Sequence, residues 1–126
     1  MNTPLLRKIQ RAIEKHPKNM DMSGAWVNHG GDVPCGTTGC IAGWAIAGAS
    51  LARLMKEPTM QGADHPIKLE AQKVLKLTNE QADRLFFMTY WPDKWHFKYH
   101  RVKTDRGRAG VVIRRIEAFI KSKGDE

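Results

Sequence analysis

Residues 39–55 read GCIAGWAIAGASLARLM, and the first three turns of this stretch carry only apolar or small side chains. A helix that is apolar on every side belongs at the centre of a fold, because a surface helix keeps one polar face. The apolar part, Cys40 to Ala52, is 13 residues long. A membrane span needs roughly 18 or more. The stretch therefore predicts a buried central helix from about Gly39 to Met55.

Start and stop signals predict further helices around this centre. Thr3 is the expected N-cap of the first helix, with Pro4 in its first turn. Thr78 opens a capping-box pattern and therefore another helix. The predicted helices, with approximate bounds, are 3–16, 39–55, 66–77, 78–91 and 109–123. The sequence thus predicts an all-α fold, a single compact domain over residues 1–126 with about five helices.

The composition is that of an ordinary globular chain. Hydrophobic residues make up 41% and charged residues 27%, which argues against disorder. Only two cysteines are present, so the chain is not a disulfide-rich secreted scaffold. Arg7, Lys8 and Arg11 interrupt the first apolar residues, and no secretory signal is expected. We therefore expect a soluble, cytoplasmic protein with reduced thiols that does not insert into membranes.

Residues 35–44, CGTTGCIAGW, form the most distinctive segment, at the end of a long glycine-rich predicted loop. Loops longer than about 12–15 residues are uncommon in compact domains and are often functional. If the helix begins near Gly39, Cys40 lies in its first turn, where unpaired N–H groups and the helix dipole lower a thiol's pKa. The same N–H groups can hold an oxyanion or a phosphate, with hydroxyl donors from Thr37 and Thr38. The segment therefore predicts either attack by Cys40 or capture of an anion.

A cysteine nucleophile needs a base, and the candidate bases are His29, His65, His96 and His100, with His29 and His65 preferred. The opposite interpretation is that Cys40 is a packing residue, because free cysteine is among the most buried residue types. Zinc is a further alternative. Its possible ligands are Cys35, Cys40, His29 and the pair His96 and His100, which are spaced by three residues. The cysteine spacing lies at the edge of zinc-site spacing, so we expect no metal and no cofactor.

Residues 84–115 carry nine Lys/Arg and two Asp, so +7 of the net charge of +8 falls there. Seven of the ten aromatic residues also lie in this stretch, within residues 86–99. Aromatic faces beside cations can stack bases and neutralise phosphates. The alternative is that Phe86, Trp91 and Trp95 fill the core while the lysines point outward. No helix-turn-helix, zinc-finger or RNA-binding signature is present, so sequence-specific DNA binding is not expected.

A set of short motifs runs along nearly the whole chain. They are His16-Pro17, Asp21-Met22, Trp26, Cys35-Gly36-Thr37, Cys40-Ile41-Ala42-Gly43-Trp44, Leu77-Thr78, Gln81, Leu85-Phe86 and Trp91-Pro92. The pattern resembles an uncharacterised family of short proteins of bacteria and their phages, and the two-cysteine motif is the specific part of the likeness. The resemblance implies a shared organisation rather than an activity. The phage setting suits an accessory role in defence or anti-defence, such as binding or destroying a nucleotide immune signal.

Three hypotheses for the function follow. The leading one is an accessory protein that binds a small anionic or nucleotide-like ligand at the turn and helix start of residues 35–44. Its candidate ligand-binding residues are Cys35, Gly36, Thr37, Thr38, Gly39, Trp44, Trp91, Trp95 and Arg101. The second hypothesis is a hydrolase or transferase that depends on Cys40 and a histidine base. The third is a basic module that binds an acidic protein partner through residues 84–115.

Overall fold

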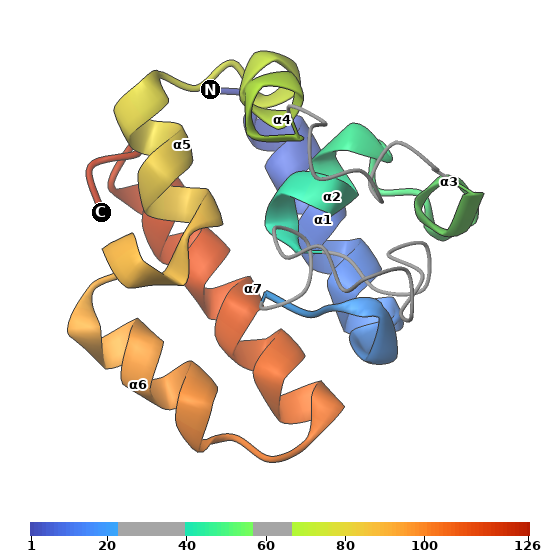
Figure 1. Ribbon diagram of the computed structural model, residues 1–126, viewed down its shortest axis with the longest axis vertical. Coiled ribbons are helices and arrows are strands. Elements are labelled where there is room, and N and C mark those ends of the chain that lie inside the picture. The colour runs from blue at the N-terminus through green and yellow to red at the C-terminus, as the bar shows by residue number, and fades with distance from the viewer. Residues whose placement is uncertain (23–39, 57–66) are drawn as a thin grey trace.

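The computed structural model describes residues 1–22, 40–56 and 67–126, and its regular elements in these ranges are helices, with no strand (Figure 1). The elements are α1 (Thr3–Lys15), η1 (Pro17–Asn19), α2 (Ile41–Ile46), α3 (Leu51–Lys56), α4 (Ile67–Leu75), α5 (Asn79–Phe86), η3 (Met88–Tyr90), α6 (Asp93–Arg101) and α7 (Asp105–Lys121), where η1 and η3 are 3-10 helices. Within the described ranges, none of the helices has the length and hydropathy to cross a bilayer. The predicted all-α class is confirmed.

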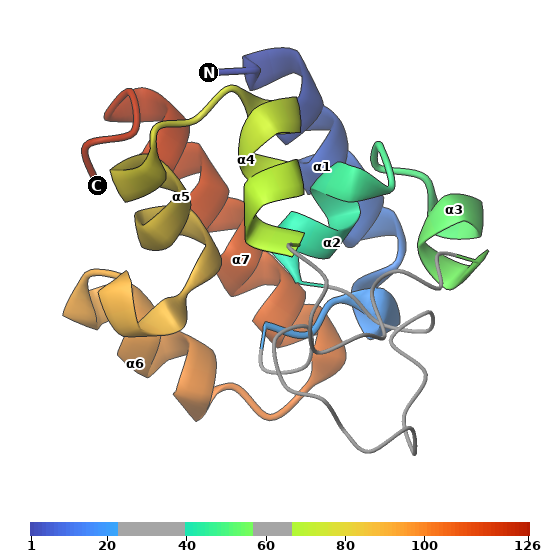
Figure 2. The same ribbon diagram turned by 45° about the horizontal axis from the view of Figure 1, so that its top comes forward.

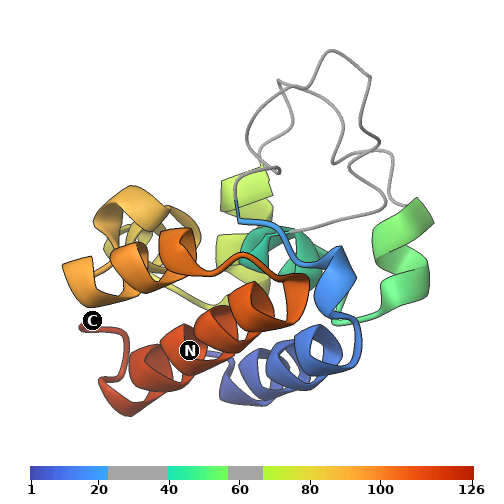
Figure 3. The same cartoon turned by 90° about the horizontal axis from the view of Figure 1, so that it is seen from below.

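Helices α1 and α7 lie side by side and form one layer of the fold (Figures 1 and 3). Helix α2 packs against α1 and α4, and all of its residues, Ile41–Ile46, are buried. Helices α5 and α6 lie on the other side of the molecule from α3 (Figure 2), with α6 packed on α7. The backbone N–H of Asn2 donates to the carbonyl oxygen of Leu75 at 2.7 Å and ties the start of α1 to the end of α4. The core therefore surrounds α2.

The predicted central helix from Gly39 to Met55 is divided into two. Between α2 and α3 the chain turns at Gly48 and Ala49, whose φ angles are 62° and 64°. The N–H of Gly48 donates to the carbonyl of Ala45 at 3.0 Å. The N–H of Ala49 donates to the carbonyl of Trp44 at 2.9 Å, which completes a Schellman helix end. Glycine allows this left-handed backbone, so the prediction of one long helix is wrong, while the prediction of a buried centre is right for α2.

Side chains cap the starts of α1 and α5. In α1 the cap is Asn2 and not Thr3 as predicted, because the Asn2 side chain accepts the N–H of Leu5 at 3.2 Å. In α5 the predicted capping box is confirmed. Thr78 Oγ1 accepts the N–H of Gln81 at 3.1 Å, and Gln81 Oε1 accepts the N–H of Thr78 at 3.0 Å.

The basic stretch contains one helix more than the sequence predicted. Residues 93–101, which lie between the predicted helices, form α6, with Pro92 at the N-cap and with Trp95 and Tyr99 buried one turn apart. Helix α7 begins at residue 105 rather than near 109, because Thr104 Oγ1 accepts the N–H of Gly107 at 3.0 Å. Helices α6 and α7, which carry most of the basic stretch, pack against each other.

Candidate functional site

Cys40 lies at the N-cap of α2, not in the first turn as predicted, and its thiol is fully buried. Burial raises the pKa of the Cys40 thiol from about 9 to about 11, although backbone N–H groups, that of Gly43 first among them, favour the thiolate. The pKa shift is opposite to the predicted lowering, because the loss of solvation outweighs these hydrogen bonds. At neutral pH Cys40 is therefore protonated and closed to solvent in this structure, as the packing interpretation expects.

The other predicted members of this site lie in segments outside the described residues. They are the bases His29 and His65 and the turn residues Cys35, Gly36, Thr37, Thr38 and Gly39. The pairing of Cys40 with a base, the anion site at the turn and the zinc site with Cys35 and His29 therefore stay predictions. Within residues 1–22, 40–56 and 67–126, no three His, Cys, Asp or Glu side chains gather as metal ligands.

The three tryptophans predicted to bind a ligand lie in the core. Trp44 is fully buried, and Trp91 and Trp95 keep 3% and 9% of their surface exposed. The indole N–H of Trp91 donates to the backbone oxygen of Leu85 at 3.0 Å. Their rings therefore leave no open face on which a ligand could stack. Arg101, the fourth described member of the predicted site, is exposed at the end of α6.

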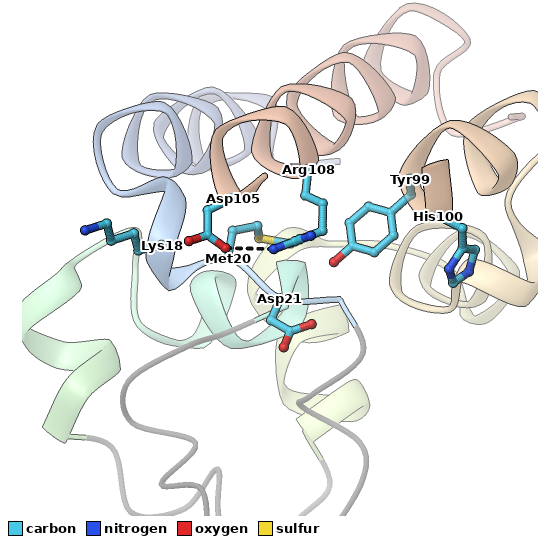
Figure 4. Close-up of a pocket in the computed structure, with 7 residues that line it drawn as sticks. All are labelled: Lys18, Met20, Asp21, Tyr99, His100, Asp105 and Arg108. Carbon is cyan, nitrogen blue, oxygen red and sulfur yellow. Dashed lines mark hydrogen bonds and ion pairs between the residues drawn. The ribbon is translucent and has the colours of Figure 1, made fainter. Parts of the chain in front are cut away.

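A cleft of about 310 Å³ opens between η1, α6 and the start of α7 (Figure 4). It is lined by Lys18, Met20, Asp21, Tyr99, His100, Asp105 and Arg108. Arg108 and Asp105 form an ion pair at 2.8 Å. With Lys18 and Asp21 added, the lining holds two cations and two carboxylates. This balance gives the cleft little preference for an anion.

A second cleft, of about 530 Å³, lies along α7 beside the end of α1. Its lining residues are Glu14, Pro17, Arg106, Ala109, Gly110, Ile113 and Arg114. Gly110 helps to keep the cleft open, because a Cβ at this position would meet no atom within 4 Å. Two arginines face one carboxylate here, so the excess of positive charge is small.

A third cleft, of about 380 Å³, lies between α1 and the turn that joins α2 to α3, and we name it the cationic cleft. It is lined by Lys8, Arg11, Ala12, Lys15, His16, Gly48 and Ala49. The three cations follow one another at helical spacing on the exposed face of α1. None of the described residues in this lining is acidic. The wall opposite α1 is the left-handed turn that breaks the predicted central helix.

Arg53 extends the positive charge of the cationic cleft. Its Nη2 atom donates to the carbonyl oxygen of Ile46 at 3.3 Å, so the side chain folds back over the turn. Its Nη1 atom lies 3.1 Å from the position that a Cβ on Gly48 would take, which places the guanidinium at the rim. The cleft thus gathers cations from α1 and from α3.

The charged side chains on the two faces of α1 have different surroundings. On the face toward α7, Arg7 forms an ion pair with Glu117, and Gln10 donates to the carbonyl of Ile113 at 3.0 Å. On the cleft face Arg11 lies three residues after Lys8 and four before Lys15, and like charges at these spacings cost about 0.2–0.5 kcal/mol a pair. A bound anion would remove this repulsion. The cleft face therefore has the charge pattern of an anion site.

Sequence reasoning missed the cationic cleft, although its lysines and arginine stood at helical spacing in a predicted helix. The other wall of the cleft is the turn at Gly48, and the sequence pattern placed this residue inside an unbroken helix. Comparison of the chain with protein-family models, with curated proteins and with solved structures finds no match.

Proposed function

We propose that the protein binds a small anionic ligand of the phosphorylated or nucleotide-like class in the cationic cleft. The observation that carries the proposal is the set of three cations on one face of α1, with no acidic side chain among the described residues that line the same cleft. The proposal keeps the predicted ligand class and moves the described part of the site away from Cys40 and Trp44, which are both buried.

The chemistry of the cleft suits a phosphate group. Arg11 carries a planar guanidinium that can donate two parallel hydrogen bonds to one phosphate, and Lys8 and Lys15 supply point charges on either side. The volume of about 380 Å³ suits a small molecule. Ligand sites commonly measure about 300–1,000 Å³. Ala12 and Ala49 add short apolar surface against which the rest of such a ligand can pack.

The proposal is tested by calorimetric titration of the purified chain with phosphate, pyrophosphate, AMP, ATP and a cyclic dinucleotide. At least one of these should bind, and it should raise the melting temperature because it binds only the folded state. Arg11→Gln should weaken that binding about tenfold or more, since hydrogen bonds to charged groups contribute about 1.5–3 kcal/mol. Cys40→Ala should leave it largely intact.

The matched control is Lys73→Gln, which removes one positive charge from an exposed position on α4 outside the cleft. If Lys73→Gln and Arg11→Gln weaken binding equally, the ligand responds only to net charge and the site is wrong. Failure of every member of the panel to bind would also overturn the proposal. An accessory role in defence or anti-defence, which the family resemblance implied, stays a prediction.

A second candidate function rests on the outer face of α6. Phe97 is 56% exposed there, and Lys94, Lys98 and Arg101 are exposed at helical spacing around it. This face suits the acidic protein partner predicted for residues 84–115, because it joins an apolar anchor to flanking cations. A labelled oligo-glutamate peptide should bind it, with an affinity that falls steeply as salt is added. Equal loss of affinity in Lys98→Gln and Lys73→Gln would count against it.

A further inference from the structure

His96 and His100 lie one turn apart on α6, with ring centres 4.6 Å apart and ring planes inclined at 53°. His100 is exposed and His96 is half-buried, so solvent reaches the pair. We infer that these two imidazoles form a binding site for a divalent transition-metal ion, of the kind that prefers nitrogen ligands. The site lies on α6, away from the cationic cleft, and does not depend on the proposed function.

The hydrogen bond of His96 fixes which of its nitrogens can bind a metal. Nδ1 of His96 lies 2.9 Å from the carbonyl oxygen of Met88. A carbonyl oxygen can only accept, so Nδ1 carries the proton. In the neutral ring the lone pair then lies on Nε2. Metal-binding histidines are commonly oriented in this way, with the second ring nitrogen donating to a backbone carbonyl.

The distance between the two ring centres is one that a shared ion allows. A metal–nitrogen bond of about 2.1 Å places the ion about 3.2 Å from each ring centre. Two rings bound at a right angle then have centres about 4.5 Å apart, and two rings at a tetrahedral angle about 5.2 Å apart. The observed 4.6 Å lies closest to the right angle. Square-planar and octahedral ions such as Cu²⁺ and Ni²⁺ bind neighbouring ligands at this angle.

The surroundings allow a cation despite the basic character of α6. His100 lines the same cleft as Asp21 and Asp105, whose carboxylates balance the charges of Lys18 and Arg108 there, so this side of the helix has no excess of positive charge (Figure 4). No third His, Cys, Asp or Glu in the described part of the chain joins the pair as a ligand. Water can fill the coordination positions that the two imidazoles leave open. Cu²⁺ should bind more tightly than Ni²⁺ or Zn²⁺, and Mg²⁺ and Ca²⁺ should not bind, because they prefer oxygen ligands.

The test is calorimetric titration of the full chain with Cu²⁺ and Ni²⁺. Loss of a hydrogen-bond partner behind a metal ligand costs about 10- to 100-fold in affinity, so His96→Gln or His100→Gln should each cost at least about tenfold. His16→Gln is the matched control, since it removes a half-buried histidine that lines the cationic cleft and lies outside α6, and it should leave the affinity for Cu²⁺ unchanged. Circular dichroism shows whether each variant is folded. If His96→Gln does not fold, His100→Gln still tests the site, because position 100 is exposed.

Paramagnetic broadening by Cu²⁺ then locates the ion in amide NMR spectra. The proposal expects broadening centred on residues 93–101, and loss of that broadening in the double variant His96→Gln/His100→Gln. Broadening centred elsewhere, or a double variant that binds Cu²⁺ as tightly as the unaltered chain, would overturn it. In that case the two rings are an aromatic contact only, and the metal is held by other groups.

Discussion

The hydroxyl oxygen of Tyr99 accepts a hydrogen bond from the backbone N–H of Met22 at 3.0 Å, across a separation of 77 residues. Tyr99 lies on α6 and is 5% exposed, and Met22 follows η1. The bond therefore joins the C-terminal half of the fold to the chain just after η1. Burial raises the pKa of Tyr99, so the hydroxyl stays protonated at neutral pH.

Replacement of Tyr99 by Phe should destabilise the fold. The substitution leaves the buried N–H of Met22 without this acceptor, and an unsatisfied buried donor costs about 1–3 kcal/mol. Urea unfolding should give that difference in the free energy of unfolding. Tyr90→Phe is the control, because Tyr90 is 61% exposed and should change stability little. Equal effects of the two substitutions would show that the bond contributes nothing.

Local signals in the sequence predicted the helical class and several helix positions. The capping box at Thr78 is one example, because all of its atoms lie within four residues of one another. The break at Gly48 was missed although the glycine was visible. Glycine is tolerated inside helices at a cost of roughly 1 kcal/mol, so its presence alone does not decide between a continuous helix and a helix end. The hydrogen bonds from Gly48 and Ala49 back to the last turn of α2 show that a helix end forms here.

The state of the Cys40 thiol can be measured directly. Because the thiol is fully buried and its pKa is raised to about 11, iodoacetamide should modify it slowly at neutral pH and rapidly after denaturation. Peptide mass spectrometry reads this site separately from any other cysteine. Rapid modification of Cys40 in the folded chain would show that the helix start opens in solution. It would support the hypothesis that Cys40 is a nucleophile.

The same pKa shift makes stability depend on pH. In the unfolded chain the Cys40 thiol loses its proton near pH 9, whereas the folded chain holds it up to about pH 11. Below pH 9 the free energy of unfolding therefore keeps the full contribution of the Cys40 thiol. This contribution falls as the pH rises toward 11, because the unfolded state then binds fewer protons than the folded state. Tyr99 adds a loss of the same sign above its own ordinary pKa. Urea unfolding across this range should show a shallower fall for Cys40→Ala, and an unchanged slope would contradict the shift.

The candidate site could be predicted from the sequence only in part. Lys8, Arg11 and Lys15 were assigned to a helix, but their cleft needs Gly48 and Ala49, which come from a distant turn. For Trp91 and Trp95 the sequence left two interpretations open, a ligand site and the core, and the structure bears out the second. An aromatic ring beside cations looks the same in sequence whether it stacks on a ligand or fills the core, and only the position of α6 against α7 distinguishes the two.

Two glycines of α7 should respond in opposite ways to the same substitution. A Cβ on Gly107 would overlap Val102 Cγ1 and lie 2.9 Å from Thr104 Oγ1, so Gly107→Ala should cost about 1–3 kcal/mol of stability through overpacking. A Cβ on Gly110 meets nothing within 4 Å. Gly110→Ala should therefore gain up to about 1 kcal/mol from helix propensity. Each variant is the control for the other in urea unfolding. If both substitutions changed the free energy of unfolding in the same direction, the close packing of Gly107 against Val102 would be contradicted.

Arg115 is a fully buried arginine of α7 at the junction with α5 and with Trp91, which follows η3. Its guanidinium lies 5.7 Å from the ring centre of Trp91 and 5.8 Å from that of Phe119. Nη2 donates to the carbonyl oxygens of Arg84 and Glu126, whereas Nε and Nη1 have no hydrogen-bond partner among the described residues. Burial lowers the pKa of Arg115 to about 10, so the group is still charged at neutral pH.

Arg115→Met and Arg115→Lys should separate the cost of this buried charge from the value of its contacts. Methionine keeps much of the volume and removes the unpaired donors, so its free energy of unfolding should lie within about 1–2 kcal/mol of the unaltered protein, or above it. Lysine keeps the charge but loses the planar fork that contacts two carbonyls and two rings, and it should be the less stable variant. Urea unfolding at neutral pH gives the order. If lysine were the more stable of the two, the charge itself and not the shape of the side chain would hold this junction together, because methionine supplies shape without charge.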